Sequence, residues 1–590
     1  MKKTRHSRFA VKCFAALMSV AMCFAAVGCG GGNNNPGGST GAGDRLQLNV
    51  VYYDFGFGGG YVNELAKRFE ELYKDVQIGD KTGVFVNTIA ERKDDIFKNA
   101  QLMKQRTDID VAFAENMFYD TLANNGALMD VSDVVNETSK YDNKTIASKM
   151  NNQQKSYLTR DGAIYAVPNY ASSYGIIYNI DLFEKNNWYF KDGYKLPDGY
   201  NEYDAICDYG VYQSTNINGM FVSSPVDKKT AGPDGVYDTE DDGLPCTYDE
   251  FFWLCKKIVQ TNESVPMVWT GNYFNDYLCR FLKSLLADAE GLDNYIANYD
   301  PVGKTVEDLV EIDDDGNVTV LAGQTLTSAD AANIRLQKGL YDGLRFINML
   351  VGVKEYHWER AFDESSSSQY DAQRQFLLSY ADDGIKDIAM LLDGAWWENE
   401  AKDDNAFAEI ESLYGASNCA KRFGWLTLPK VSKAAYEESK QVYCADSLNA
   451  FVVIRNGVTG DKAEIAKDFV RYACSDESLQ AFTVVTGALK AFDYTLSDAN
   501  YKKLTDFGKA YYDAMKNKST KPTFVYSYAN SALYASNPDY FYTNFYNVGA
   551  TTGVVKSMQL ASEGGFKYAN AKTAFNDIYK YAQTMMNGKV

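Results

Sequence analysis

Histidine is almost absent from this sequence of 590 residues, which contains only His6 and His357. His6 lies in an N-terminal segment that we expect to be removed, so one histidine is left for the folded protein. A Ser-His-Asp triad, a His-ligated zinc ion or a Cys-His pair would all have to use His357. The sequence therefore disfavours most hydrolytic and metal chemistries, although a pair of carboxylates could still act as in glycosidases.

Positive charge is also scarce. The chain has 59 basic and 78 acidic residues and a formal net charge of −19. Five of the basic residues precede position 13, so the chain beyond the N-terminal segment carries about −24. Nucleic acids and anionic lipids are bound by clustered Lys and Arg, so we predict neither as a partner. An acidic, solvated surface is a sufficient explanation for this charge.

Paired cysteine motifs are missing too. Seven cysteines follow Cys29, which is an odd number, and no CxxC occurs. They are Cys207, Cys246, Cys255, Cys279, Cys419, Cys444 and Cys474. A chain of this size does not need disulfides for stability, so we interpret them mainly as buried small hydrophobic residues. One pair, such as Cys246 with Cys255, could form a bridge.

The longest N-terminal apolar run, Phe14–Val27, is too short to span a bilayer, which takes about 20 apolar residues. It follows a basic head and ends at small residues, which predicts a signal peptide over 1–28. Ala26–Cys29 resembles a bacterial lipobox, so we expect Cys29 to be lipidated and to hold the protein at the extracellular face of the cell membrane. Plain secretion is the alternative. Residues 29–44 are rich in Gly and Asn and predict a flexible linker.

The folded sequence begins with a pattern of alternating strands and helices. We predict a strand from Leu46, a helix from Gly60 with Leu72 on its apolar face, a helix over 90–104 and a buried strand over 108–114. Such alternation indicates parallel strands, and ligands of parallel sheets bind at the carboxyl ends of strands. The polar residues Glu115 and Asn116 directly follow the buried strand, so both are candidate ligand-binding residues.

A family resemblance emerges from Asp161 onward, where the chain contains D-G-x-x-Y-x-x-P followed by Y-N-x-x-L-F. This pattern resembles the extracellular solute-binding proteins of sugar-importing ABC transporters, the group that includes maltose-binding protein. Further segments follow in the order of that family: GALMD at 126–130, IAMLLDGAWWENEA at 388–401, FGWLTLPK at 423–430 and the stretch 449–489. The resemblance extends over about 45–490.

The resemblance implies an α/β fold of two lobes that close on a ligand like a hinged clamp, the type II fold of periplasmic binding proteins. Each lobe would be built from discontinuous chain. We expect lobe 1 to contain 45–167 plus 384–435, and lobe 2 to contain 168–383 plus 436–590. Crossing segments are expected near 165–169, 376–393 and 428–443.

Aromatic side chains, which form 14% of the chain, supply the remaining candidate ligand-binding residues. Aromatic rings offer an apolar face and, in Tyr and Trp, a polar edge, which suits sugar rings. In the resembling family a Trp of the 388–401 segment stacks on a sugar, and Trp396 matches its position. The other aromatic candidates are Trp397, Tyr273, Tyr170, Tyr174 and Tyr546.

An acidic loop at 232–243 is an insertion relative to the compact members of that family. Its carboxylates Asp234, Asp238, Glu240 and Asp242 could surround Ca²⁺, which prefers six to eight oxygen ligands. The spacing is not that of an EF-hand, and an acidic solvated hairpin is the alternative. We expect no other cofactor.

These features together predict a binding protein, not an enzyme. It would be a lipid-anchored monomer that captures a carbohydrate, most simply an oligosaccharide, and delivers it to the membrane permease of an ABC importer. Two alternatives stay open: the same fold binding a peptide or metabolite, and a secreted glycosidase that uses two carboxylates.

Overall fold

The computed structural model describes residues 41–195, 209–262, 264–313, 316–382, 384–526 and 569–589, with 537, 540, 541, 553–555 and 558. The chain divides into two units, Met1–Arg45 and Leu46–Val590. The predicted signal peptide, Cys29 and most of the predicted linker lie outside the described residues. Among the residues that are described, no helix is long and apolar enough to cross a membrane.

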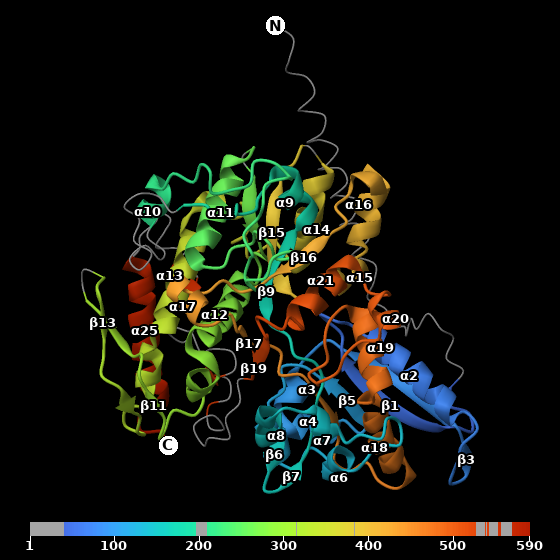
Figure 1. Ribbon diagram of the computed structural model, residues 1–590. Helices are drawn as coiled ribbons and strands as arrows, with labels where there is room; N and C mark the ends of the chain where they lie inside the picture. Colours follow the sequence, from blue (N-terminus) through green and yellow to red (C-terminus); the bar gives the residue numbers. More distant parts are fainter. Residues whose placement is uncertain are drawn as a thin grey trace. The chain divides into compact units, whose positions relative to one another are not determined.

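The first sheet of the second unit contains five strands (Figure 1). In their order across the sheet they are β4 (Val84–Glu91), β1 (Leu46–Tyr53), β5 (Val111–Ala114), β18 (Phe451–Ile454) and β8 (Val167–Pro168). β1 pairs in parallel with β4 and β5, as the alternating pattern predicted, whereas β18 is antiparallel to β5 and β8. All four residues of β5 are buried, which explains its continuous apolar sequence.

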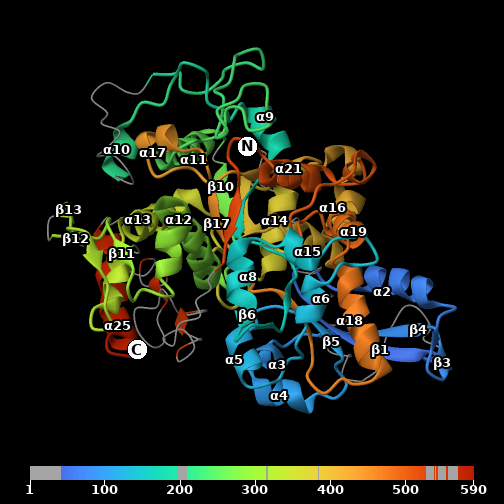
Figure 2. The same cartoon turned by 60° about the horizontal axis from the view of Figure 1, so that its bottom comes forward.

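The helices that belong with this sheet come from two parts of the chain, 60–158 and 461–486. They are α2 (Gly60–Tyr73), α3 (Asp95–Lys98), α4 (Ala100–Gln105), α5 (Tyr119–Asn124), α6 (Ser132–Asn136), α7 (Ile146–Lys149), α8 (Asn152–Leu158), α18 (Asp461–Ala473) and α19 (Asp476–Thr486). α2 contacts β4 and α19, and α18 contacts β1, so segments distant in sequence lie side by side (Figure 2).

Two local predictions for this region are wrong. On α2 the buried stripe is Tyr61, Leu65, Phe69 and Tyr73, whereas Leu72 is 49% exposed, because the stripe advances by four residues at each step. The predicted helix over 90–104 is interrupted. Its first residues belong to β4, whose pairing with β1 extends to Glu91, and only α3 and α4 follow.

The second sheet contains four strands. In order they are β10 (Val265–Val268), β15 (Ile388–Gly394), β9 (Tyr174–Asn179) and β16 (Phe423–Leu426). β15 is parallel to β10, and β9 is antiparallel to both β15 and β16. The associated helices are α9 (Ile180–Asn186), α11 (Tyr248–Gln260), α12 (Phe274–Ala297), α13 (Lys338–Gly352), α14 (Gln369–Ala381), α15 (Trp397–Asp403), α16 (Ala406–Tyr414), α21 (Asp506–Met515) and α25 (Ala569–Met586).

Short elements connect and extend these layers. They are β2 (Gln77–Ile78), β3 (Lys81–Thr82), β6 (Thr159–Arg160), β7 (Ala163–Ile164), β11 (Thr305–Val306), β12 (Val310–Ile312), β13 (Val318–Val320), β14 (Gln324–Thr325), β17 (Tyr443–Ala445), β19 (Thr523–Val525), α10 (Tyr209–Ser214), α17 (Lys433–Glu438), α20 (Asp498–Tyr501), η1 (Ala331–Leu336), η2 (Lys354–Tyr356) and η3 (Ala416–Asn418).

The sheet partners correct the predicted division of the chain between the lobes. β15 and β16 lie within 384–435, which we expected in lobe 1, but both pair with β9 in the second sheet. β18 lies within 436–590, expected in lobe 2, but pairs with β5 in the first sheet. A buried apolar strand has the same sequence character in either sheet, so its partner cannot be read from the pattern alone.

Three segments therefore pass between the two sheets, at 169–173, 446–450 and 487–505. Asn169, in the first of them, is hydrogen-bonded to the other two. Its backbone N–H donates to the Ala450 carbonyl at 3.0 Å, and its carbonyl accepts from the Ala491 N–H at 3.2 Å. Its side chain accepts a hydrogen bond from Lys490 and donates to the Tyr61 hydroxyl at 3.2 Å. The first crossing segment lies just beyond its predicted position near 165–169. The other two were predicted near 376–393 and 428–443, and the structure places neither of them there.

The structure shows the state of two of the cysteines and the packing of His357. Cys246 and Cys255 are free thiols, so the bridge that we considered between them is not formed. Cys255 is fully buried in α11, as expected of a small hydrophobic residue. His357 packs against the rings of Trp269 and Phe362, with centroid distances of 5.4 and 5.0 Å.

A glycine on β9 allows the second sheet to pack. A Cβ atom on Gly175 would lie 2.2 Å from Cζ2 of the buried Trp425 on β16. We predict that Gly175→Ala lowers the free energy of unfolding by about 1–3 kcal/mol, because the indole would have to move in a packed core. Urea denaturation measures the change.

Gly60→Ala is the matched control, since the nearest atom to its added Cβ is 4.0 Å away. This change in the first turn of α2 should be neutral or slightly stabilising. Equal midpoints for the two variants would contradict the prediction.

Candidate functional site

The loop after β1 brings together groups from both sheets. Gly56 and Gly58 have φ angles of 63° and 62°, a region that favours glycine. The Gly56 N–H donates to Oε1 of Glu400 on α15 at 3.2 Å. A Cβ atom on Gly56 would lie 3.7 Å from Cγ of Trp396 and 3.8 Å from Oε1 of Glu115. Two of the predicted residues, Trp396 and Glu115, are thus close together at this glycine.

Trp396 stands at the N-terminus of α15, directly after β15, as the sequence predicted. Its ring packs edge-on against Tyr174 at a centroid distance of 4.9 Å and against Phe57 at 6.3 Å. Phe57 in turn contacts Tyr170 at 4.7 Å. Trp396 is only 4% exposed, so in this structure its ring contacts other protein rings.

Glu115 and Tyr170 form a buried pair beside these rings. The Tyr170 hydroxyl donates to Oε1 of Glu115, and both residues are less than 5% exposed. Burial raises the pKa of Glu115 to about 8, although the hydrogen bond from Tyr170 and the charge of Arg280 oppose this shift. Glu115 is therefore a carboxyl group whose charge is poorly compensated by its surroundings.

A second carboxyl pair lies at the end of β15 and was not predicted. The Gln373 amide donates to Oδ2 of Asp393 at 3.0 Å and to Oε2 of Glu400 at 2.9 Å. Burial raises the pKa of Asp393 to about 7, and burial followed by repulsion from Asp393 raises the pKa of Glu400. Glu400 follows Trp396 by four residues, so helical spacing places both on one side of α15.

A cavity of about 240 Å³ opens beside Glu400. It is lined by Asp54, Phe55, Gly56, Gly58, Arg92, Tyr370, Glu400, Asp403 and Asp404. The loop after β1 and α14 with α15 supply most of these residues, so the cavity lies between elements of the two sheets. Arg92 pairs with Asp54 at 3.1 Å, and Arg374 pairs with Asp404 at 2.7 Å. The lining combines aromatic rings with several carboxylates, a set that can stack on a ring and accept hydroxyl hydrogen bonds.

Several predicted site residues lie elsewhere. Trp397 is fully buried against the rings of Phe423 and Phe507, at 5.2 and 5.3 Å, so it belongs to the core and its prediction as a ligand-binding residue is wrong. Tyr273 precedes α12 and is 56% exposed, and one turn further Tyr277 packs on Tyr174 at 4.7 Å. The helical step from 273 to 277 is the signal that would have identified the inner tyrosine.

Asn116 and Tyr546 complete the predicted set. Asn116 has a φ of 52°, and its backbone N–H donates to the Leu448 carbonyl at 2.7 Å, which ties the end of β5 to the second crossing segment. Tyr546 lies outside the described residues.

The acidic loop at 232–243 is internally hydrogen-bonded. The carboxylate of Asp234 accepts from the Val236 N–H at 2.7 Å and from the Asn517 amide at 3.0 Å, and that of Asp242 accepts from the Asp238 N–H at 2.9 Å. Within the described ranges, no group of three or more His, Cys, Asp or Glu side chains could hold a metal ion. Calcium binding by Asp234, Asp238, Glu240 and Asp242 stays a prediction.

Comparison with known proteins shows what this architecture resembles. Residues 64–342, slightly under half of the chain, match the family described as bacterial extracellular solute-binding protein. No curated protein sequence matches the chain.

Solved structures share the fold at low identity. A chitin oligosaccharide binding protein is 12% identical, with 92% of this chain and 100% of that one covered and a TM-score of 0.52. Apo RafE from Streptococcus pneumoniae is 14% identical, with coverage of 93% and 100% and a TM-score of 0.51. A probable secreted solute-binding lipoprotein from Streptomyces coelicolor is 12% identical, with coverage of 90% and 98% and a TM-score of 0.50.

The two sheets and the crossing segments form a two-lobed α/β fold of the type II periplasmic-binding-protein class, the fold that these solved structures share. The match of residues 64–342 to the family described as bacterial extracellular solute-binding protein agrees with the resemblance seen in the sequence motifs.

The buried carboxyl of Glu115 generates a pH prediction. Its pKa in the folded protein, about 8, lies above the ordinary value of 4.5, so the folded state binds more protons between these values. The free energy of unfolding contributed by this group is therefore retained at low pH and lost as pH rises toward 8. Glu115→Gln cannot ionise, so the variant should gain stability relative to the wild type progressively from pH 5 to pH 8.

Urea denaturation of both proteins at pH 5, 6.5 and 8 measures this difference. Other buried carboxyls titrate in both proteins and cancel from it. A difference that stays constant over the three pH values would show that Glu115 is already ionised in the folded protein.

Proposed function

We propose that this protein captures a carbohydrate, most simply an oligosaccharide, and delivers it to the permease of an ABC importer without chemical change. One observation carries this proposal. At Gly56, Trp396 meets the carboxyl groups of Glu115 and Glu400, and the adjacent cavity between the two sheets is lined by the rings of Phe55 and Tyr370. Rings that stack on sugar faces and oxygens that accept from hydroxyls are the groups that sugar recognition requires.

The names of structurally similar proteins support a sugar as the ligand. One solved structure is RafE in complex with raffinose, with a TM-score of 0.50 and 13% identity, and another is the chitin oligosaccharide binding protein already described. At such identities these likenesses concern the fold, so the sugar assignment rests on the chemistry of the cavity.

Ligand capture would use the crossing segments as a hinge. They are the only connections between the sheets within the described residues, and both sheets contribute groups to the cavity. A ligand that contacts both sides stabilises the closed arrangement by its differential affinity for it. Closure around the solute would present the loaded protein to the permease.

Phe55 offers the sharpest test, because it lines the cavity yet is 37% exposed. We predict that Phe55→Ala weakens oligosaccharide binding about tenfold, or about 1.4 kcal/mol, through the loss of one stacking face. The stability without ligand should change little. Calorimetric titration with a panel that includes raffinose and chitin oligosaccharides measures affinity, after a thermal-shift screen has selected the ligand.

Leu72→Ala is the matched control, since Leu72 is 49% exposed on the outer side of α2 and does not line the cavity. Its affinity should equal that of the wild type. No shift with any sugar would redirect the proposal to a peptide or metabolite, and a released product would replace it by a glycosidase.

We also propose that the protein is anchored through lipidated Cys29. The anchor would keep the binding protein near its permease after signal-peptide removal. Cys29→Ser should move the protein from the membrane fraction to the soluble extracellular fraction, as measured by cell fractionation and immunoblotting. A variant that stays with the membrane would contradict lipidation at this residue.

A further inference from the structure

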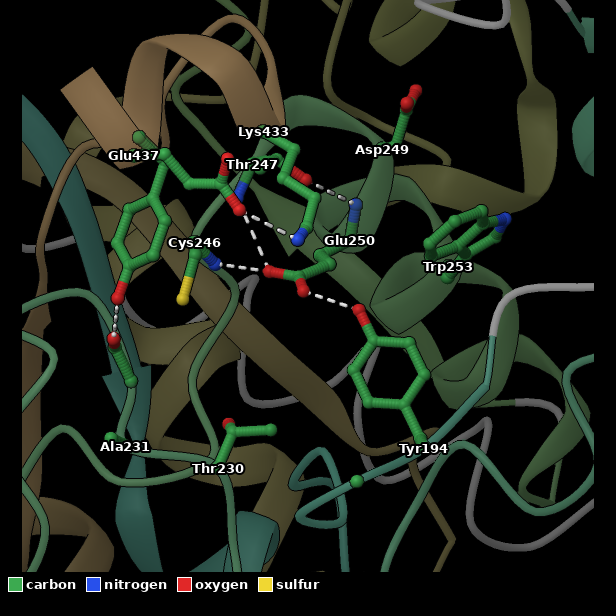
Figure 3. Close-up of a pocket in the computed structure, with 13 residues that line it drawn as sticks. Tyr194, Thr230, Ala231, Cys246, Thr247, Asp249, Glu250, Trp253, Lys433 and Glu437 are labelled. Carbon is green, nitrogen blue, oxygen red and sulfur yellow. Dashed lines mark hydrogen bonds and ion pairs between the residues drawn. The ribbon is translucent and has the colours of Figure 1, made fainter. Parts of the chain in front are cut away.

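Two cavities of this protein have acidic linings, and they differ in how far the protein itself engages the carboxylates. In the larger one, of about 390 Å³, Glu437 pairs with Lys433 at 2.8 Å (Figure 3). Glu250 accepts from two backbone N–H groups and from a tyrosine hydroxyl, and Asp249 also accepts from a tyrosine hydroxyl. Donors of the protein therefore engage every carboxylate of this lining.

The cavity beside Glu400 is different. Its lining contains the carboxyl groups of Asp54, Glu400, Asp403 and Asp404 against one guanidinium group, that of Arg92. Arg92 pairs with Asp54 at 3.1 Å, and Asp404 pairs with an arginine outside the lining at 2.7 Å. No ion pair of the described residues includes Glu400 or Asp403. These two carboxyl groups of the described lining therefore have no cationic partner.

Helical spacing places both carboxyl groups on one face of α15. Glu400 follows Trp396 by four residues, and Asp403 follows Glu400 by three. The loop after β1 faces them: the Gly56 N–H donates to Glu400, and a Cβ atom on Gly58 would lie 3.1 Å from Oδ2 of Asp403. The indole and the two carboxyl groups thus form one line along this loop, which we call the α15 stripe.

Asp403 stands where the fold itself does not favour an acid. It is the last residue of α15, and the carbonyl groups at a helix C-terminus carry partial negative charge. Partial burial, and then repulsion from Asp54, raises the pKa of Asp403. Lys402 opposes this shift, but its ammonium pairs with Glu398 at 3.2 Å. Neither helix stability nor an ion pair of the described residues explains an acid at this position.

Geometry separates a metal ion from an ammonium group as the missing cation. Within the described ranges, no three His, Cys, Asp or Glu side chains are grouped so as to hold a metal ion. An ammonium group donates three hydrogen bonds, and carboxylate and hydroxyl oxygens all accept them. Such charge-assisted hydrogen bonds are about twice as strong as neutral ones. A ligand with a protonated amine therefore fits the α15 stripe, whereas a phosphate or carboxylate would meet charge of its own sign.

The rest of the lining suits the sugar to which such an amine would be attached. Phe55 is 37% exposed and Tyr370 is partly exposed, and both line the cavity beside the stripe. Rings that contact a sugar face and carboxyl groups that bind an amine are complementary to different parts of one molecule.

We propose that the carbohydrate captured in this cavity is an oligosaccharide of amino sugars, whose protonated amine binds Asp403 and Glu400. This inference rests on the proposed function, because it concerns the ligand of the same cavity. A neutral sugar would leave both carboxyl groups uncompensated, and an amino sugar supplies the positive charge that the lining lacks.

A trimer of β-1,4-linked glucosamine and its N-acetylated counterpart form the matched probe pair, because they share one skeleton and differ in charge. Calorimetric titration at about pH 6.5 keeps the amines protonated, since amines of this kind have pKa values above about 7. The glucosamine trimer should bind at least about tenfold more tightly than the acetylated trimer.

Failure of this inference and failure of the proposed function give different results. If neutral sugars bind and the glucosamine trimer binds no more tightly than its acetylated counterpart, the inference is overturned and the proposed function stands. If no sugar binds, charged or neutral, the proposed function falls and the inference falls with it.

Asp403→Asn tests the charge at a position that no ion pair of the described residues uses, so the fold should be retained. It should weaken binding of the glucosamine trimer about tenfold and leave that of the acetylated trimer unchanged. Asp403→Glu, which keeps the charge, should retain the preference for the amine. Equal losses for the two trimers in Asp403→Asn would overturn the inference.

Asp75→Asn is the matched control, because it removes the same charge from an exposed residue that does not line the cavity. Its affinities for both trimers should equal those of the wild type. A loss as large as that of Asp403→Asn would show that the preference arises from the overall charge of the protein, and would overturn the assignment to the α15 stripe.

Discussion

The hydrogen bonds of Asn169 join the three segments that cross between the sheets. Its backbone and side chain bind the other two crossing segments and Tyr61 of α2. The first sheet receives β18 only after the chain has returned from the second lobe, and α21 packs on β16 of the second sheet after the third crossing. The cavity beside Glu400 depends on the same junction, because its lining comes from loops and helices that these segments position on opposite sides.

The elements that could be predicted are those whose secondary structure is set by a short stretch of sequence. β1, β5 and β15 were visible as buried apolar runs, and the strand-end positions of Glu115 and Trp396 followed from them. The strands that pair in a sheet can be far apart in the sequence, so a short pattern does not reveal the partner. For this reason β15, β16 and β18 were assigned to the wrong lobes. The same limit applies to the site: Glu400 and Gln373 act through contacts with Gly56 and Asp393 that no short pattern contains.

The two neighbouring indoles show how backbone position outweighs residue type. Trp396 and Trp397 have the same chemistry, but one is the residue before α15 and the other its first residue. The first therefore lies among Phe57 and Tyr174, while the second is enclosed by core phenylalanines.

The edge-on packing of Trp396 has a consequence for affinity. In this arrangement the rings of the site satisfy one another, so an incoming solute does not meet a waiting aromatic surface. In the proposed binding mode, a solute that stacks on Trp396 replaces contacts that the protein already makes with itself. Net affinity would then be a difference between two sets of ring contacts, and discrimination between solutes would follow from how completely each one substitutes for Tyr174 and Phe57 around the indole.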